Sequence, residues 1–551
     1  SMRVSLSWLQ DLVKVEDSAE QLAERLSMAG FEVEEIEDLS SLAQGVVVGY
    51  VLEREKHPDA DKLSVCKVDV GANAPLQIVC GASNVRAGIH VPVATVGAVL
   101  PAVDLKIKPG QLRGVASEGM ICSLAELGQS SDVDGIAILE DLVSAVPSPG
   151  TPVAGVLGLD DTVLELAITA NRPDGLSMAG IAREVSALTG GVLTLPVLQQ
   201  PKASAPLETD ASSAEAMKQG GLYAVTELKG VNASVPSPSW LRQRLERAGM
   251  NSVNAVVDLT NVVMLEQGQP LHAFDADVLD GLCGGDVSAA DFGLRQASDG
   301  EVFKGLDGRE IKLDSRAQVV TCRNRPVALA GVMGSEESGV TQATQRIWLE
   351  SALFSPIAVH NSSRCGGMRT ESSSRYEKGL PVEVTLAAAQ RAIELIQQHL
   401  GGVAGPTNVC SAPQQEKPPL LLRRLALHQL LGPLASEEGP EDLDDAVIEQ
   451  CLTALGCELS ECEDGWSVRV PPSRSCDLVR EVDLIEEVAR LVGFDRFESH
   501  LPDPLEPGGL TPMQQAERRL RSLLCFNHSG QRVSKFIPLL RRLIIVVLFV
   551  L

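Results

Sequence analysis

Aromatic side chains are scarce in this sequence: they make up 3% of its 551 residues, although 44% of the residues are hydrophobic. Its cores must therefore be built mainly from Leu, Val, Ile and Ala. Positive charge is also in short supply, since 47 Lys and Arg stand against 73 Asp and Glu and give a formal net charge of −26. Such a chain repels phosphates, which excludes diffuse binding of nucleic acid over the whole surface but not binding through a local basic face.

Paired cysteines and long apolar runs are missing too. The 12 cysteines include no CxxC pair, which excludes the common zinc-finger spacings. Cys66, Cys80 and Cys322 stand in apolar, strand-like runs, where we expect buried free thiols. No secretory signal is visible at the start, so we expect a reduced, cytoplasmic compartment. The apolar run 543–551 is far shorter than the roughly 20 residues of a membrane helix, and we interpret it as a buried segment cut short or an aberrant tail.

Signatures of a self-contained enzyme are also lacking. The sequence has no P-loop, no GxGxxG after a strand, no HExxH and no GxSxG. The length itself predicts three to five domains, at about 100–200 residues each.

Local patterns predict a series of elements. Ser18 and Gln21 have capping-box spacing at the start of a helix over 17–30. Short β-rich runs between turn residues predict a small closed or partly open barrel, with strands at 46–52, 63–70, 77–79, 91–99 and 106–107. Further helices are predicted at 182–188, 239–248, 382–400 and 484–492, and strands at 255–258 and 318–321. Pro-rich composition predicts linkers at 195–214, 406–419 and 500–512.

Two stretches in the barrel region carry a family resemblance. Residues 57–63 (HPDADKL) and 112–123 (LRGVASEGMICS) together resemble the tRNA-binding OB-fold domain of several tRNA-handling proteins. Local positive charge accompanies them, and the residues we expect to contact tRNA are Lys62, Lys106, Lys108 and Arg113. The alternative interpretation is that these are scattered, solvated charges on an ordinary small barrel.

Further motifs follow in order: 166–177 (LAITANRPDGLS), 256–261 (VVDLTN), 268–275 (GQPLHAFD), 328–334 (ALAGVMG), 349–352 (LESA), 369–379 (RTESSSRYEKG) and 483–490 (DLIEEVAR). From Met2 to about Leu524 the chain resembles the β-subunit family of bacterial-type phenylalanyl-tRNA synthetases. From Phe526 onward the resemblance stops, although the family continues into a catalytic-like and an anticodon-binding domain.

The resemblance implies an α+β multidomain fold. It comprises a split N-terminal α/β domain (1–38 with 152–195), an OB-fold tRNA-binding barrel (39–151), an α/β editing domain pair (215–405), a small helix-turn-helix-like α/β module with an acidic metal site (415–500) and the truncated start of a catalytic-like domain (513–551).

The resemblance also implies a pocket that hydrolyses mischarged Tyr-tRNA(Phe). A tyrosine hydroxyl needs a polar partner, which phenylalanine would leave unpaired, and Glu350 is the natural acceptor. The other expected pocket residues are Thr260, Asn261, His272, Gly334, Thr370 and Ser372. Taken singly, Glu350 could be an edge charge, His272 a structural histidine and Asn261 a helix cap. Asn251 and Ser372 depart from the family pattern, in which Arg and a small apolar residue are common.

Four acids form a second candidate site. Asp483, Glu486 and Glu487 fall at i, i+3 and i+4 of a predicted helix, and Asp477 precedes them. Hard oxygen ligands suit Mg²⁺, whereas the alternative is a solvated helix face in which Glu486 pairs with Arg490. The resemblance implies a magnesium site at these four positions, shared with an α subunit.

We therefore expect a tRNA(Phe)-binding β subunit of an α₂β₂ phenylalanine–tRNA ligase, in which a separate α subunit activates phenylalanine with ATP. The alternatives are a free-standing tRNA-editing hydrolase and a non-catalytic tRNA-binding fragment.

Overall fold

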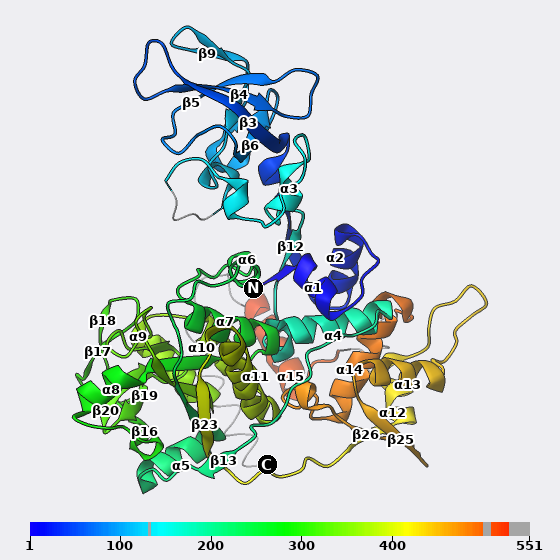
Figure 1. Cartoon of the computed structure of the whole chain (residues 1–551). Coiled ribbons are helices and arrows are strands. Elements are labelled where there is room, and N and C mark those ends of the chain that lie inside the picture. Colours follow the sequence, from blue (N-terminus) through cyan, green and yellow to red (C-terminus); the bar gives the residue numbers. More distant parts are fainter. Residues whose placement is uncertain (130–133, 500–507, 528–551) are drawn as a thin grey trace. The chain divides into compact units, whose positions relative to one another are not determined.

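The computed structural model describes residues 1–129, 134–499 and 508–527. The chain divides into one unit over Ser1–Phe497 and a second over Glu498–Leu551. The first unit mixes helices with several separate sheets (Figure 1), in agreement with the expected α+β multidomain class. The apolar run 543–551 and part of the linker predicted at 500–512 lie outside the described residues.

Two segments distant in the sequence form the N-terminal part. A three-stranded antiparallel sheet has the order β1-β12-β2, so that residues 162–166 pair with both strands from the first 38 residues. The predicted capping box is present, because Ser18 and Gln21 bond reciprocally at the start of α2. The elements are β1 (Met2–Ser5), α1 (Leu6–Leu12), α2 (Ala19–Met28), β2 (Val33–Asp38), α3 (Val153–Val156), β12 (Thr162–Leu166) and α4 (Met178–Thr189).

The inserted segment is a nearly closed barrel with strand order β11-β6-β3-β4-β5. Its ends approach each other where Ser117 Oγ accepts from Val79 N at 3.1 Å and Glu118 N donates to Gln77 O at 2.8 Å. The strands are β3 (Val46–Lys56), β4 (Ser64–Asp69), β5 (Leu76–Cys80), β6 (His90–Thr95), β7 (Val99–Leu100), β8 (Leu105–Lys106), β9 (Gly110–Leu112), β10 (Val115–Ser117) and β11 (Gly119–Ile121). Cys66 and Cys80 are buried free thiols here, as predicted.

The central region contains a five-stranded sheet, β13-β23-β14-β22-β15, and a four-stranded sheet, β16-β19-β20-β21. Its strands are β13 (Ser204–Pro206), β14 (Leu222–Lys229), β15 (Leu271–Asp275), β16 (Phe292–Gln296), β17 (Val302–Lys304), β18 (Glu310–Lys312), β19 (Gln318–Cys322), β20 (Arg325–Leu329), β21 (Met333–Gly334), β22 (Arg346–Leu353) and β23 (Val403–Ser411). Its helices are α5 (Ala211–Gly220), α6 (Ser239–Arg247), α7 (Ala255–Gln267), α8 (Ala276–Cys283), α9 (Pro356–Gly366), α10 (Glu371–Lys378) and α11 (Val382–Leu400). Cys322 is buried in β19, as predicted.

The strand predicted at 255–258 is wrong, because these residues begin helix α7. Asn254 caps the helix by accepting from Val257 N, and Gly268 ends it in the left-handed conformation. Almost every side of α7 is buried, so its apolar residues show no helical period, and its valines favour a strand locally. Burial in the tertiary structure, rather than local sequence preference, therefore makes this segment a helix.

Two predicted linkers are also wrong in part. The segment 195–214 contains β13, and β23 occupies most of the first half of 406–419. Strand β23 tolerates Gly405 and Pro406 because its register with β14 shifts between Thr226 and Leu228, which leaves both residues out of the ladder.

A smaller module closes the first unit. A three-stranded antiparallel sheet, β24-β26-β25, packs with three helices around buried Trp466. The elements are β24 (Leu420–Arg423), α12 (Arg424–Leu431), α13 (Asp445–Ala454), β25 (Glu458–Cys462), β26 (Gly465–Arg469) and α14 (Glu481–Val492). In the second unit, α15 (Pro512–Asn527) begins with reciprocal bonds between Thr511 and Gln514. None of the helices in the described part of the chain is long and apolar enough to cross a membrane.

Candidate functional site

One cavity in the central region brings together residues from five elements. Its volume is about 430 Å³, and all seven residues predicted for the pocket line it. These residues are Thr260 and Asn261 of α7, His272 of β15, Gly334 of β21, Glu350 of β22, and Thr370 and Ser372 at the start of α10. The remaining walls are mostly apolar, which makes a polar group inside the cavity decisive for what it can bind.

Glu350 and His272 face the cavity from neighbouring strands. They are direct partners in the antiparallel pairing of β15 with β22, so their side chains lie on the same face of the sheet. Glu350 is 6% exposed, and its Oε2 accepts a 2.6 Å hydrogen bond from the hydroxyl of Tyr223. Among the described residues, no lysine, arginine or histidine forms an ion pair with this carboxylate. Burial raises the pKa of Glu350 to about 7, although the bond from Tyr223 acts in the opposite sense.

His272 is held by close packing. Its ring lies edge-on to Phe274 at 4.5 Å between centroids. A Cβ on Gly334 would lie 2.3 Å from His272 Cε1, so only glycine fits beside the ring. Burial lowers the pKa of His272 to about 4, which keeps the imidazole neutral at physiological pH. Its Nε2 is buried and has no hydrogen-bond partner among the described residues.

The hydroxyl groups of the pocket are partly engaged. Thr260 Oγ1 donates to Val257 O at 2.7 Å within α7. Thr370 caps α10 by accepting from Ser373 N, and its hydroxyl donates to Val332 O at 2.9 Å. Ser372 Oγ lies 3.8 Å from Met264 Sδ. Asn261 lies inside α7 rather than at its start, so the helix-cap alternative for this residue is wrong.

Sequence reasoning missed three neighbours of this site. Tyr223 holds Glu350, and Met264 and Tyr376 line the cavity. Tyr376 donates its hydroxyl to Ala352 O at 2.8 Å. No motif contains Tyr223, and only the pairing of β14 with β22 brings it near Glu350. Asn251, one of the two departures from the family pattern, is exposed and does not line the cavity.

The four residues expected to contact tRNA lie in the barrel region. Lys106 and Lys108 line a hollow of about 760 Å³. Arg113 and Gly114, both with positive φ, form the two-residue turn between β9 and β10. His57 joins the two motifs of this region, because its Nε2 lies 3.0 Å from Leu112 O. Lys62 and the other three expected tRNA contacts are exposed, and none forms an ion pair within the described ranges.

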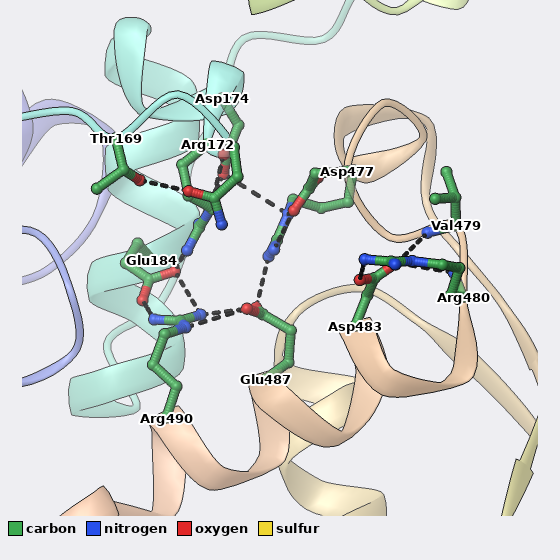
Figure 2. Close-up of polar contacts among 12 residues, drawn as sticks. Thr169, Arg172, Asp174, Glu184, Asp477, Val479, Arg480, Asp483, Glu487 and Arg490 are labelled. Atoms are coloured by element: carbon green, nitrogen blue, oxygen red, sulfur yellow. Dashed lines mark hydrogen bonds and ion pairs between the residues drawn. The ribbon is translucent and has the colours of Figure 1, made fainter. Parts of the chain in front are cut away.

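The four acids predicted to bind metal line one small pocket of about 260 Å³. Arginines already engage three of them (Figure 2). Arg474 bonds Asp477 at 2.7 Å and Glu487 at 2.8 Å, Arg490 bonds Glu487 at 2.7 Å, and Arg480 bonds Asp483 at 2.9 Å. The predicted pairing of Glu486 with Arg490 is wrong, because Arg490 pairs with Glu487 and with Glu184 of α4.

Arg474 and Arg490 belong to a buried network. Arg172 bonds Asp174 at 2.9 Å and Glu184 at 3.2 Å (Figure 2). Arg474 lies 3.9 Å from Asp174. Although burial opposes it, Arg490 and Arg474 hold the pKa of Glu487 down to about 2. Asp477 and Glu487 are thus neutralised by the chain itself. In the part of the chain that the structure describes, no group of three or more His, Cys, Asp or Glu is arranged to hold a metal ion.

Comparisons with known proteins match family models to three regions of this chain. Family models match residues 46–145 as a putative tRNA binding domain, residues 220–401 as a B3/4 domain and residues 422–494 as a tRNA synthetase B5 domain. The chain is 67% identical over 524 residues to a phenylalanine–tRNA ligase beta subunit of Parasynechococcus marenigrum, covering 95% of this chain and 64% of the relative. Beta subunits of Synechococcus sp. (strain CC9605) and Prochlorococcus marinus (strain MIT 9313) are 66% and 62% identical with the same coverage. The chain therefore spans 64% of the length of these relatives, slightly less than two thirds.

Proposed function

Because the chain belongs to the phenylalanine–tRNA ligase β-subunit family, we propose that it binds tRNA(Phe) and hydrolyses mischarged Tyr-tRNA(Phe) as part of that ligase. A separate α subunit activates phenylalanine with ATP in this proposal, the assembly is α₂β₂ and the compartment is the cytoplasm. In this proposal the B3/4 region (220–401) performs the editing. We also propose the division into five domains that the family resemblance implies, which includes an OB-fold barrel and an editing domain pair.

The observation that carries the proposal is a buried carboxylate in a mostly apolar cavity. Glu350 has one oxygen engaged by Tyr223 and lines the cavity. A tyrosyl side chain can satisfy the carboxylate with its hydroxyl, whereas a phenylalanyl side chain would desolvate it without a partner. A site built around a hydrogen bond to a substrate hydroxyl rejects the analogue that lacks it, so the cavity favours the wrong amino acid and spares the right one.

Hydrolysis then needs a positioned water molecule. Water adds to the ester carbonyl, the bond to the ribose oxygen breaks, and tyrosine and uncharged tRNA leave. His272 is neutral at physiological pH and has an unpartnered Nε2, which suits a group that orients water. Thr260, Asn261, Thr370 and Ser372 add polar groups around the ester, and Gly334 permits close approach of the backbone.

Deacylation of the two charged tRNAs tests the proposal. The full chain should hydrolyse Tyr-tRNA(Phe) much faster than Phe-tRNA(Phe). Glu350→Ala should reduce this discrimination by roughly 10- to 150-fold, the value of one charged hydrogen bond, and should reduce ester hydrolysis in general less. His272→Ala should slow both reactions. Equal rates for the two esters in the wild type would refute editing. If Glu350→Ala discriminates as well as wild type, recognition belongs to another residue.

The barrel supplies the proposed tRNA contact. Lys62, Lys106, Lys108 and Arg113 are exposed and have no carboxylate partner among the described residues, so they are available to phosphates. Replacing Lys106, Lys108 and Arg113 by Glu should weaken tRNA binding and flatten its dependence on salt. The matched control is Lys67→Glu, because Lys67 is exposed on β4 but lies 3.6 Å from Glu53. An unchanged salt slope in the triple variant would exclude this face.

We propose that this chain binds Mg²⁺ only together with an α subunit. Asp477 and Glu487 do not fit a metal ion while Arg474 and Arg490 hold them. Glu486 is exposed and unpaired within the described ranges, and Asp483 is held by Arg480, whose side chain is 71% exposed and can move away at little cost. These two acids would hold Mg²⁺ with oxygens from an α subunit. Isothermal titration with MgCl₂ should detect no tight site in this chain alone.

Assembly with an α subunit and the activities of the chain alone distinguish the proposed ligase subunit from the two alternative functions. The chain should form no phenylalanyl-adenylate without an α chain, and ATP–pyrophosphate exchange by the purified chain would contradict the subunit assignment. Co-purification with an α subunit distinguishes a ligase subunit from a free-standing editing hydrolase. The deacylation assay distinguishes that hydrolase from a non-catalytic tRNA-binding fragment.

A further inference from the structure

We infer that Tyr223 is a specificity-positioning residue of the proposed editing site, because its hydroxyl fixes one oxygen of Glu350 and leaves the other for the hydroxyl of a tyrosyl substrate. This inference rests on the proposed function and adds a residue that does not itself reach the substrate.

The contact is short and fully buried. Tyr223 in β14 has no exposed surface, and its hydroxyl donates to Glu350 Oε2 at 2.6 Å. A separation of 2.5–2.7 Å is typical of a hydroxyl that donates to an ionised oxygen, roughly twice as strong as a neutral bond. Glu350 lines the cavity and Tyr223 does not, so Tyr223 approaches the carboxylate from behind. Its effect on a substrate must therefore pass through Glu350.

The groups around Glu350 make the protonation of its carboxyl group depend strongly on the hydroxyl of Tyr223. Glu371 of α10 lines the same cavity but is paired with Arg375 at 2.7 Å. The remaining titratable groups around the pair are His272 from β15, Tyr376 from α10 and, next to Tyr223, Cys322 from β19. All three are neutral at physiological pH, since burial lowers the pKa of His272 and raises the pKa values of Tyr376 and Cys322. No cation pairs with Glu350 among the described residues, so Tyr223 is the donor that favours its ionised form.

Removal of the hydroxyl should therefore have two linked effects. In Tyr223→Phe, Glu350 loses its fixed orientation and takes up a proton more readily at neutral pH. A protonated carboxyl accepts a hydrogen bond less well than a carboxylate. Discrimination between Tyr-tRNA(Phe) and Phe-tRNA(Phe) should fall roughly 10-fold, the lower end of the range for a bond to a charged group. The pH at which discrimination is half-maximal should rise, and hydrolysis of Phe-tRNA(Phe) should change little.

The matched control is Thr226→Val on the same strand. Thr226 is buried and its hydroxyl bonds Thr407 at 2.9 Å, outside the cavity. This variant removes a buried hydroxyl bond from β14 without contact with Glu350. It should lower the melting temperature without shifting the pH midpoint of discrimination. A similar shift in both variants would mean that Tyr223 acts only through strand stability.

A double-mutant cycle and a spectroscopic titration complete the test. In the Glu350→Gln background of the same chain, Tyr223→Phe should cause no further loss of discrimination, because its role requires the carboxylate. Infrared difference spectra should show the protonated-carboxyl band of Glu350, identified by its loss in Glu350→Gln, titrating at higher pH in Tyr223→Phe. Additive losses or an unshifted band would overturn the inference while leaving editing intact. A wild-type chain that does not discriminate would overturn the proposed function and this inference together.

Discussion

At the scale of single residues, the central cavity is shaped by side chains that leave little choice of replacement. Gly334 lies against the ring of His272, and Glu350 is buried without a cation. Each of these arrangements costs stability, since a buried carboxylate gives up its hydration and an unpartnered Nε2 makes no hydrogen bond. Strained or unsatisfied groups of this kind gather where a protein binds or reacts, which makes the cavity a functional candidate on physical grounds.

Gly334→Ala should disturb the cavity directly. The new Cβ would lie 2.3 Å from His272 Cε1 and 2.5 Å from Nε2, so the ring must move. Overpacking of this kind costs about 1–3 kcal/mol, and urea denaturation should show that loss together with slower deacylation. The control is Gly281→Ala in α8, where a Cβ would meet nothing within 4 Å. That substitution should be neutral or slightly stabilising, and an equal loss in both variants would contradict the steric explanation.

Glu350 should make stability depend on pH. Its pKa is raised from the ordinary value of 4.5 to about 7, so the folded state binds the proton more tightly than the unfolded state. Stability should consequently fall as pH rises from about 4.5 to about 7, by up to about 3 kcal/mol, and stay lower above that range. Glu350→Gln removes this dependence. The variant should therefore gain stability relative to wild type between pH 5 and pH 8, measured by chemical denaturation, and a constant difference would contradict the raised pKa.

At the scale of elements, α7 is the helix on which the cavity depends most. It carries Thr260 and Asn261, and it packs against α11 and β15. Its two ends are fixed by Asn254 and Gly268. The amide of Asn254 also donates to Val340 O at 3.1 Å, and Val340 lines the cavity. Asn254 thus connects the start of the helix to another residue that lines the cavity.

Asn254→Ala should loosen α7 at this end. Loss of the cap costs about 0.5–2 kcal/mol, and the backbone of Val340 loses its donor. Hydrogen exchange at Val257 and thermal denaturation should both report the change. Asn254→Asp keeps the oxygen that caps the helix and removes the amide, so it should restore the exchange protection of α7 but not the bond to Val340. Equal protection in Asn254→Ala and wild type would show that burial alone holds the helix start.

At the scale of the whole molecule, ion pairs link regions far apart in the sequence within the first unit. Arg490 in α14 bonds Glu184 in α4 (Figure 2). Arg490 also donates to Ala29 O, and Arg474 bonds Glu487 and lies near Asp174. These groups are nearly all buried, so each carboxylate depends on its arginine. The network therefore couples residues 422–494 to the N-terminal part of the chain.

Arg490→Met should uncouple these regions. It leaves Glu184 and Glu487 buried with one partner fewer, and breaking a buried pair costs about 3–5 kcal/mol. Calorimetry should show an earlier transition for this part of the chain, in the presence of EDTA as well as Mg²⁺. The control is Arg423→Ala, which removes a more exposed pair with Glu481 and should have little effect. Protection by Mg²⁺ in the wild type would contradict a network that needs no metal.

Sequence alone determined the local features of this protein. The capping box at Ser18 and Gln21 and the helix Val382–Leu400 are formed as predicted, because short-range hydrogen bonds, glycine stops and a clear apolar period specify them. The motifs also carried the family assignment and named seven residues that line one cavity. The resemblance grouped these seven residues before their geometry was known, and the structure places them around one cavity.

Only the tertiary structure decided the rest. Helix α7 is buried on almost every side and has no readable period, and β23 exists because β14 and β13 pair with its main chain despite Pro406. Tyr223 meets Glu350 across 127 positions of sequence. Arg474 and Arg490 form ion pairs with Glu487, one of the acids that the family resemblance assigned to a magnesium site. Contacts between residues so far apart depend on how strands pair and helices pack, and no local pattern of residues encodes that choice.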